Sequence, residues 1–199
     1  KRWIQRVSIA GLGIALLFAL VLFRSYRRKQ RDNKLLARQK TQIEEQKEAI
    51  TDSIIYAQRI QKAILPNEDF MNGILTDYFI FFKPRDIVSG DFYWMSRKNG
   101  KIFLVAADCT GHGVPGAFMS MLGVSFLNEI VNKTRIEKCN VILDSLREYV
   151  ISSLHQTGRE GEAKDGMDLS MVILDTKTME VQFSGANNPI YVVTSLSEK

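Results

Sequence analysis

The residues best placed to do chemistry are two aspartates on neighbouring predicted strands. Asp108 ends the apolar run 101–107, and Asp91 lies within the strand-like run 88–95. Asn99-Gly100 between the runs is a strong hairpin signal. A turn at 97–100 places position 91 opposite positions 106 to 108, because antiparallel strands pair back from their turn. We therefore expect the two carboxylates to lie close together.

Two facing carboxylates in a partly buried site cannot both stay ionised without a cation. Their all-oxygen chemistry favours magnesium, manganese or calcium over zinc. Because these ions take about six ligands or more, water and backbone carbonyls must contribute, and the glycine-bearing turn after Asp108 leaves carbonyls accessible. His112 lies in the same turn. It is either a ligand or a histidine hydrogen-bonded to the backbone or to groups around the site.

The segment 111–116, GHGVPG, also matches the GxGxxG pattern of dinucleotide-binding folds. Three features argue against that function. Asp108 would place a negative charge beside the pyrophosphate, and the strand before the motif belongs to a hairpin, not to a βαβ unit. In addition, no strand ending in an acid follows the helix, as the ribose contact requires.

The elements that position these residues alternate in type along the chain. Strands are predicted over 77–83, 88–95, 101–107, 167–175, 179–184 and 190–194, and helices over 115–132 and 141–157, the second capped by Asn140. Strands, then two helices, then strands indicate an α+β domain with antiparallel sheets and helices packed on one face.

The N-terminal part has a different character. The run 7–23 carries no charge, and with Trp3 and Ile4 it predicts a transmembrane helix over 3–23. Seven Lys or Arg against one acid follow in 24–38. This concentration of the net charge of +5 gives no reason to expect a nucleic-acid partner. More positive charge follows the apolar run than precedes it, so we expect a single-pass protein of the inner membrane with its C-terminal part in the cytoplasm.

The segment 32–65 has no Gly or Pro and repeats apolar residues every seven positions. These heptad a positions are Leu36, Ile43, Ile50, Ala57 and Ile64. The d positions are mostly polar, and Ile54 stands one place beyond d, which indicates a slip of register. We expect a basic segment and a weak parallel dimer helix over 24–65 that transmits a signal from the membrane. The alternative is a single solvated helix.

Several motifs occur together and in order. They are YAQRIQKAILP, KPRDIVSGDFYW, VAADCTGHGVPGAFMSMLG, DGMDLSMVILD and FSGANNPIYVV. Over about 54–194 the chain resembles the SpoIIE/RsbU branch of the PPM metal-dependent protein serine/threonine phosphatases. The resemblance implies an antiparallel β-sandwich flanked by helices, of which 66–199 is the N-terminal part. It also implies two Mn²⁺ or Mg²⁺ ions and in-line attack of a metal-activated water on phosphoserine or phosphothreonine.

The same resemblance assigns roles to individual residues. Asp91 matches the acid of the SGD motif, and Asp108 matches the acid that bridges both ions. The backbone carbonyl of Cys109 matches a ligand position, so its thiol need not be a nucleophile. Asp165 and Asp168 either approach a further metal or are solvated acids near a loop.

Two further metal-binding aspartates of the family have no counterpart before Lys199. We therefore expect an active parent phosphatase and an inactive or weak 199-residue chain. The implied substrate is a phosphorylated regulator of the anti-sigma-factor-antagonist type in bacterial signal transduction. The alternative is a membrane-tethered dimeric signalling scaffold with a degenerate phosphatase fold that binds without hydrolysis.

Overall fold

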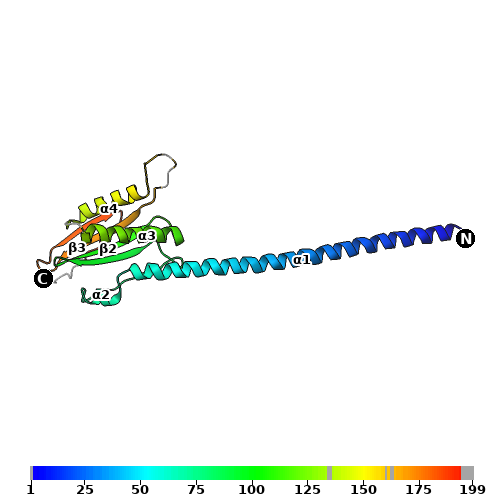
Figure 1. The fold of residues 1–199 in the computed structure, drawn as a ribbon, viewed down its shortest axis with the longest axis horizontal. Helices are drawn as coiled ribbons and strands as arrows, with labels where there is room; N and C mark the ends of the chain where they lie inside the picture. Colours follow the sequence, from blue (N-terminus) through cyan, green and yellow to red (C-terminus); the bar gives the residue numbers. More distant parts are fainter. Residues whose placement is uncertain (1, 134–135, 160, 162–163, 194–199) are drawn as a thin grey trace, which may run out of the picture. The chain divides into compact units, whose positions relative to one another are not determined.

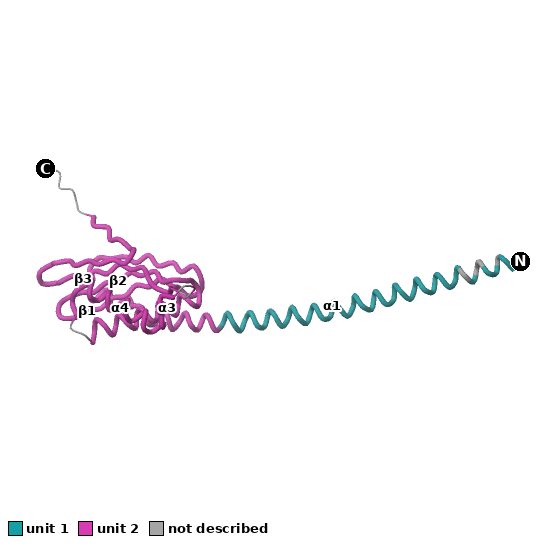
Figure 2. Tube along the Cα trace, turned by 90° about the horizontal axis from the view of Figure 1, so that it is seen from above, with its two compact units in different colours: residues 1–52 teal, residues 53–199 magenta. Residues whose placement is uncertain are grey.

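The computed structural model describes residues 2–133, 136–159, 161 and 164–193, except the side chains at 4, 7, 8 and 10. The chain divides into two compact units, 1–52 and 53–199 (Figure 2). The first unit is the larger part of helix α1, Arg2–Ile64. The predicted membrane span is helical. The apolar residues described between positions 11 and 23 are exposed and do not belong to a core.

The second unit is built on one antiparallel sheet in the order β1-β2-β3-β4 (Figure 1). Its strands are β1 Phe92–Lys98, β2 Lys101–Cys109, β3 Met167–Asp175 and β4 Val181–Ala186. The β1–β2 turn is the predicted Asn-Gly hairpin, with positive φ at Asn99 and Gly100 (54° and 79°). The structure thus confirms a mixed fold with an antiparallel sheet.

Two helices cover one face of this sheet (Figure 1). They are α3, Gly113–Asn128, which continues into the π-helical turn Glu129–Lys133, and α4, Cys139–Ser153. The main core lies between these helices and the sheet, where Phe103, Leu127, Ile142 and Met171 have no exposed surface. Among the described residues, 113–133 is the helix apolar and long enough to cross a membrane, with half of it buried. Its packing accounts for its apolar character.

The opposite face of the sheet carries a smaller apolar cluster. Met95 and Ile102 point there because side chains alternate along a strand. Met71 of the short helix α2, Glu68–Asn72, packs on them. Asn67 caps this helix by accepting a hydrogen bond from the amide of Phe70 at 2.8 Å.

Several predicted boundaries were wrong. The segments 77–83 and 190–193 are not strands, since within the described chain no strand pairs with them; position 194 lies outside that part. The rings of Phe79 and Phe81 are consequently about nine-tenths exposed, at 90% and 85%. β1 starts at Phe92 because the backbone of Ser89 bonds to a glutamine side chain instead of a strand. α4 starts one residue before Asn140, with Lys138 at the cap position, and ends at Ser153.

The core predicts a contrast between two neighbouring residues of α4. Ile142→Ala should lower the free energy of unfolding by about 2–5 kcal/mol, because it leaves a cavity in the main core. The matched control is Val141→Ala, on the exposed side of α4, which should cost about 0.5 kcal/mol or less. Urea denaturation followed by the fluorescence of buried Trp94, in a Trp3→Phe background, measures both. Equal effects would contradict the packing of α4.

Candidate active site

The β1–β2 hairpin brings Asp91 and Asp108 together. Asp91 directly precedes β1, and the pairing of Phe92 with Ala107 makes 91 and 108 the next opposed positions. The two carboxyl groups share a hydrogen bond. Both lie on the sheet face away from α3 and α4, because they alternate with Phe92 and Ala107, which face the main core. The spacing of the hairpin signal therefore predicted this contact correctly.

The environment of this pair raises the pKa of Asp91. Although Asp91 as a residue is exposed, loss of solvent around its carboxyl group is the largest cause, followed by the hydrogen bond to Asp108 and the negative charge of Asp108. A cation bound at the pair would stabilise the ionised form of both carboxyl groups. Asp91 and Asp108 line a cleft of about 490 Å³ together with the segment 79–83 and Asn188.

Backbone carbonyls of the turn after Asp108 approach Gly90, the residue before Asp91, because two glycines pack there without side chains. A Cβ atom on Gly90 would lie 2.8 Å from the carbonyl oxygen of Gly111 and 3.2 Å from that of Cys109. A Cβ atom on Gly116 would lie 2.6 Å from the same Gly111 oxygen. Any side chain at 90 or 116 would therefore push the turn away from the start of β1. The geometry keeps the backbone of the turn against Gly90 and so fixes the start of the segment that carries Asp91.

The thiol of Cys109 belongs to the core and not to the reaction. Its residue is 4% exposed. Burial, and then the charges of Asp108 and Asp91, raise the pKa of the thiol to about 12. Because the thiolate is the nucleophilic form, the side chain stays protonated and inert at neutral pH.

His112 makes a side-chain hydrogen bond to a carboxylate of another segment. Its Nδ1 lies 2.9 Å from Oδ2 of Asp86. The pair joins the start of α3 to the loop that leads into Asp91. Sequence analysis placed Asp86 only in a turn and gave it no partner, because the contact spans 26 residues of sequence.

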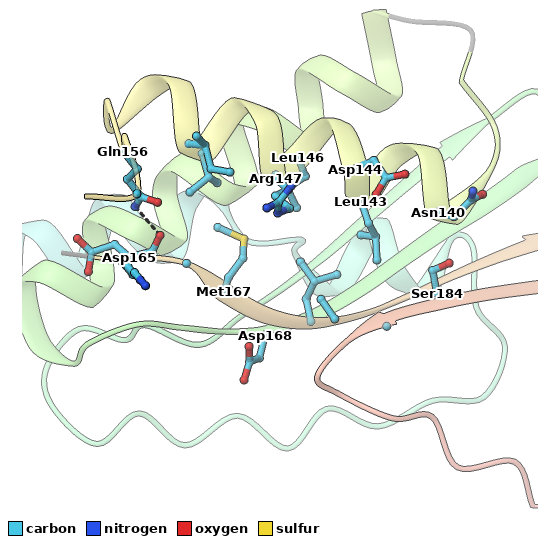
Figure 3. Close-up of a pocket in the computed structure, with 18 of the residues that line it drawn as sticks. Asn140, Leu143, Asp144, Leu146, Arg147, Gln156, Asp165, Met167, Asp168 and Ser184 are labelled. Atoms are coloured by element: carbon cyan, nitrogen blue, oxygen red, sulfur yellow. Dashed lines mark hydrogen bonds between the residues drawn. The ribbon is translucent and has the colours of Figure 1, made fainter. Parts of the chain in front are cut away.

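The other two candidate acids lie apart from each other. Asp168 is directly opposite Asp108 in the β2–β3 ladder, and Asn187 Nδ2 donates to its Oδ1 at 3.0 Å. Asp165 lies in the loop before β3, where its carbonyl accepts from Gln156 Nε2 at 2.7 Å. Asp165 and Asp168 also line a larger cavity, about 730 Å³, between α4 and the β3–β4 edge (Figure 3). In Figure 3 the side chain of Asp168 points away from α4, whereas Met167 points toward it.

The larger cavity lacks the carboxyl pair, so the smaller cleft is the better candidate for the chemistry. Within the described part of the chain, no group of three or more His, Cys, Asp or Glu side chains is close enough to hold a metal ion. A cation at Asp91 and Asp108 would therefore need further ligands besides these two side chains.

Comparison with known proteins agrees with this geometry. The SpoIIE family (Stage II sporulation protein E) matches residues 98–199. The chain belongs to the SpoIIE family. The solved SiaA-PP2C domain of Pseudomonas aeruginosa is 32% identical over 70% of this chain, with a TM-score of 0.62. The match covers 55% of that domain, so this chain spans about half its length. A search of curated proteins gave no match.

The SpoIIE domain here also contains a contact that the sequence did not reveal. Gln61 of α1, only 5% exposed, makes hydrogen bonds to both the carbonyl and the amide of Ser89. Its Nε2 donates to the Ser89 carbonyl at 2.6 Å, and its Oε1 accepts from the Ser89 amide at 3.0 Å. The same Nε2 donates to Ser120 Oγ of α3 at 2.8 Å. Helix α1 thereby fixes the backbone two residues before Asp91.

Only a weak signal for this contact exists in the sequence. Gln61 is a polar residue between the apolar a positions Ala57 and Ile64, and a solvated helix has many such glutamines. A second contact of the same kind, from Gln58 Nε2 to the carbonyl of Ile87 at 2.6 Å, lies one turn earlier. Together the two glutamines replace strand pairing for the segment before β1.

The raised pKa of Asp91 predicts how stability depends on pH. In a metal-free buffer, wild-type protein loses stability as pH rises through this raised pKa, because the folded state holds a proton that the unfolded state releases. Asp91→Asn removes this loss. It should therefore melt above the wild type once the pH exceeds the raised pKa, and the difference should vanish below the ordinary aspartate pKa of about 3.9.

Melting curves from pH 4 to pH 8 with a chelator present would measure this effect. The control is Asp144→Asn, an exposed carboxylate of α4, which should follow the wild type. A pH-independent difference for Asp91→Asn would contradict the raised pKa of Asp91.

The Gln61 contact predicts a local loss of protection. Gln61→Leu leaves the buried Ser89 amide without its acceptor, which should cost about 1–3 kcal/mol. Hydrogen exchange at Ser89 should accelerate, while the amides of β2 and β3 keep their ladder bonds. Lys62→Leu, at the next and exposed position of α1, is the control. Unchanged exchange at Ser89 would show that Gln61 does not hold this backbone.

Proposed function

We propose that the protein is a metal-dependent serine/threonine phosphatase that hydrolyses phosphoserine or phosphothreonine on a regulatory protein. The observation that carries the proposal is the carboxyl pair, Asp91 with Asp108, at one end of a SpoIIE-family sheet. Membership of a phosphatase family supplies the class of reaction. The pair supplies acidic ligands at the positions where the family motifs call for them.

The residues present fit two Mn²⁺ or Mg²⁺ ions. Asp91 and Asp108 would hold them with carboxylates, and Cys109 with its backbone carbonyl. The close approach of Gly90 to the Cys109 and Gly111 oxygens provides the oxygen-lined surroundings that such ions prefer. Such ions need more ligands than these three groups, and we assign them to other residues of the full-length domain; the match covers 55% of the SiaA domain.

Bound ions of this kind activate a water and neutralise the charge of the phosphoryl oxygens. The chain's own residues do the rest. Asp91 and Asp108 would serve as ligands in their ionised forms, which a nearby cation favours. The Cys109 thiol, with its pKa of about 12, forms no covalent phosphoenzyme. The His112–Asp86 hydrogen bond and Gln61 hold the two ends of the segment that presents Asp91.

The setting of this activity is a further part of the proposal. We place residues 3–23 across the inner membrane as a single span, with the phosphatase domain in the cytoplasm. Two copies associate through α1, and the substrate is a phosphorylated anti-sigma-factor antagonist or a similar small regulator. The exposed apolar surface of α1 and the basic segment 24–38 after it support the anchor and its orientation.

A pair of substitutions in the full-length protein tests the catalytic proposal. Asp108→Ala should lower the rate of manganese-dependent hydrolysis of a phosphoserine protein on the order of 10²–10³-fold with the fold retained, because several kcal/mol of metal-based stabilisation are lost. Cys109→Ala keeps the backbone carbonyl and should retain most of the activity. Circular dichroism checks the fold of both variants.

A different result would favour the scaffold. If Asp108→Ala and wild type were equally inactive yet bound the phosphoprotein equally well, the fold would serve binding alone. If Cys109→Ala abolished turnover while the fold persisted, a thiol mechanism would replace the metal mechanism.

A further inference from the structure

The basic residues that follow the apolar run of α1 gather on one side of the helix. Since each residue turns an α-helix by about 100°, all of them except Lys29 fall within about one third of the circumference: Arg24, Arg27, Arg28, Arg31, Lys34 and Arg38. All are exposed. The other side carries Tyr26 and Asn33, which are uncharged, and the Tyr26 hydroxyl accepts a hydrogen bond from Gln30 Nε2 at 3.0 Å.

The first four of these basic residues form the part of the stripe nearest to the apolar run. Arg24, Arg27, Arg28 and Arg31 are spaced at three, four and seven positions from the first, so their side chains are neighbours on adjacent turns. We call these four residues the arginine face. Lys29, in contrast, has no basic residue three or four positions away, and Asp32 stands three positions after it.

Aromatic residues indicate the depth at which the arginine face lies in a membrane. Trp3 and Tyr26 are both exposed, and the helix between them is about 35 Å long. Trp and Tyr are enriched at the two interfaces of a bilayer, whose hydrocarbon core is about 30 Å thick. The arginine face begins beside Tyr26 and extends over about 10 Å of helix, so it lies among the lipid headgroups.

One arginine is already turned toward the apolar run. The guanidinium carbon of Arg27 lies 4.8 Å from the ring centre of Phe23, within the range of a cation–π contact. Phe23 and Leu20 line a hollow on the helix surface together with the arginine face, and Asp32 stands at its far end. Apolar surface beside guanidinium groups matches a phospholipid, in which the acyl chains adjoin the phosphate.

We infer that the arginine face binds the headgroup of an anionic phospholipid in the cytoplasmic leaflet. The inference rests on the membrane anchor in the proposed function and adds a ligand to it. The positive-inside rule concerns the number of basic residues near a membrane, so it explains a basic segment but not its one-sidedness. A bound headgroup explains both, because guanidinium groups pair with phosphate oxygens and several can reach one phosphate only from the same side.

Lipid is a better occupant of this face than nucleic acid, although both carry phosphates. The hollow includes Leu20 and Phe23, which belong to the apolar run and would lie at the edge of the hydrocarbon core. A nucleic acid would have to approach those side chains through the headgroup layer, which is itself rich in phosphate. Clusters of four or more basic residues directly after a membrane span are typical of sites for anionic lipids.

Lipid immobilisation by the full-length protein in phosphatidylcholine nanodiscs tests this inference. Electron paramagnetic resonance measures how much spin-labelled phosphatidylglycerol the protein immobilises, relative to spin-labelled phosphatidylcholine. The wild type should prefer phosphatidylglycerol, and salt should weaken the preference. Arg27→Gln should lower it about fivefold, the effect of one basic residue at an anionic surface. Lys29→Gln is the matched control: it removes the same charge from the other side and should keep the wild-type preference.

A second variant separates position from net charge. Arg31→Gln combined with Asn33→Arg moves one arginine to the other side of the helix and leaves the net charge unchanged. It should lose the preference as Arg27→Gln does. Gln and Arg are both good helix formers, so α1 should persist, and circular dichroism checks it.

Each contrary outcome overturns a defined part. Equal losses for Arg27→Gln and Lys29→Gln, or a wild-type preference in the variant with the moved arginine, would show that net charge alone attracts the lipid. Displacement of the labelled lipid by millimolar inorganic phosphate or by a DNA duplex would assign the face to those ligands instead. Release of the protein from membranes by alkaline carbonate would refute the anchor together with this inference. The phosphatase assay of Asp108→Ala would still decide the catalytic proposal separately.

Discussion

Two carboxyl groups held within hydrogen-bonding distance across a hairpin are the constraint on which this domain depends. Asp91 and Asp108 repel each other when ionised, so their closeness must be imposed by other parts of the chain. The β1–β2 register imposes it from one side, through the Asn99-Gly100 turn. The core beneath the strands, with Phe103 and Leu127 fully buried, keeps that register fixed, because a slip of one residue would expose the whole apolar face.

The segment before β1 must also be held in place, and within the described part of the chain it pairs with no strand. Gly90 approaches the carbonyls of the turn after Asp108, and Gln61 binds the backbone of Ser89. The His112–Asp86 hydrogen bond closes the same segment at its other end. In the proposed function the repulsion is offset only once a cation is bound, so the pair needs such supports before that. The supports come from α1, α3 and a loop, which are distant in sequence from one another.

The sequence predicted the parts of this site that depend on local spacing. The hairpin, the pairing of Asp91 with Asp108 and the helix after the glycine turn all follow from signals within about 20 residues. Contacts made by polar side chains over long separations, such as Gln61 with Ser89, have no periodic signal and were missed. The strands expected at 77–83 and 190–194 failed for another physical reason: a β-strand is defined by its neighbour, and apolar alternation does not supply one. The aromatic residues at 79–82 therefore indicated burial in a sheet, but no strand of the described residues pairs with this segment.

The chemical character of the Gln61 contact has a consequence for how the domain responds to its surroundings. An amide carries no charge and does not titrate, so the attachment of α1 to Ser89 is independent of pH and is little affected by salt. The exposed His112–Asp86 pair, in contrast, lies where salt and protons reach it. The segment before Asp91 is thus attached to α1 by hydrogen bonds whose strength changes little with the pH and the salt concentration around the domain.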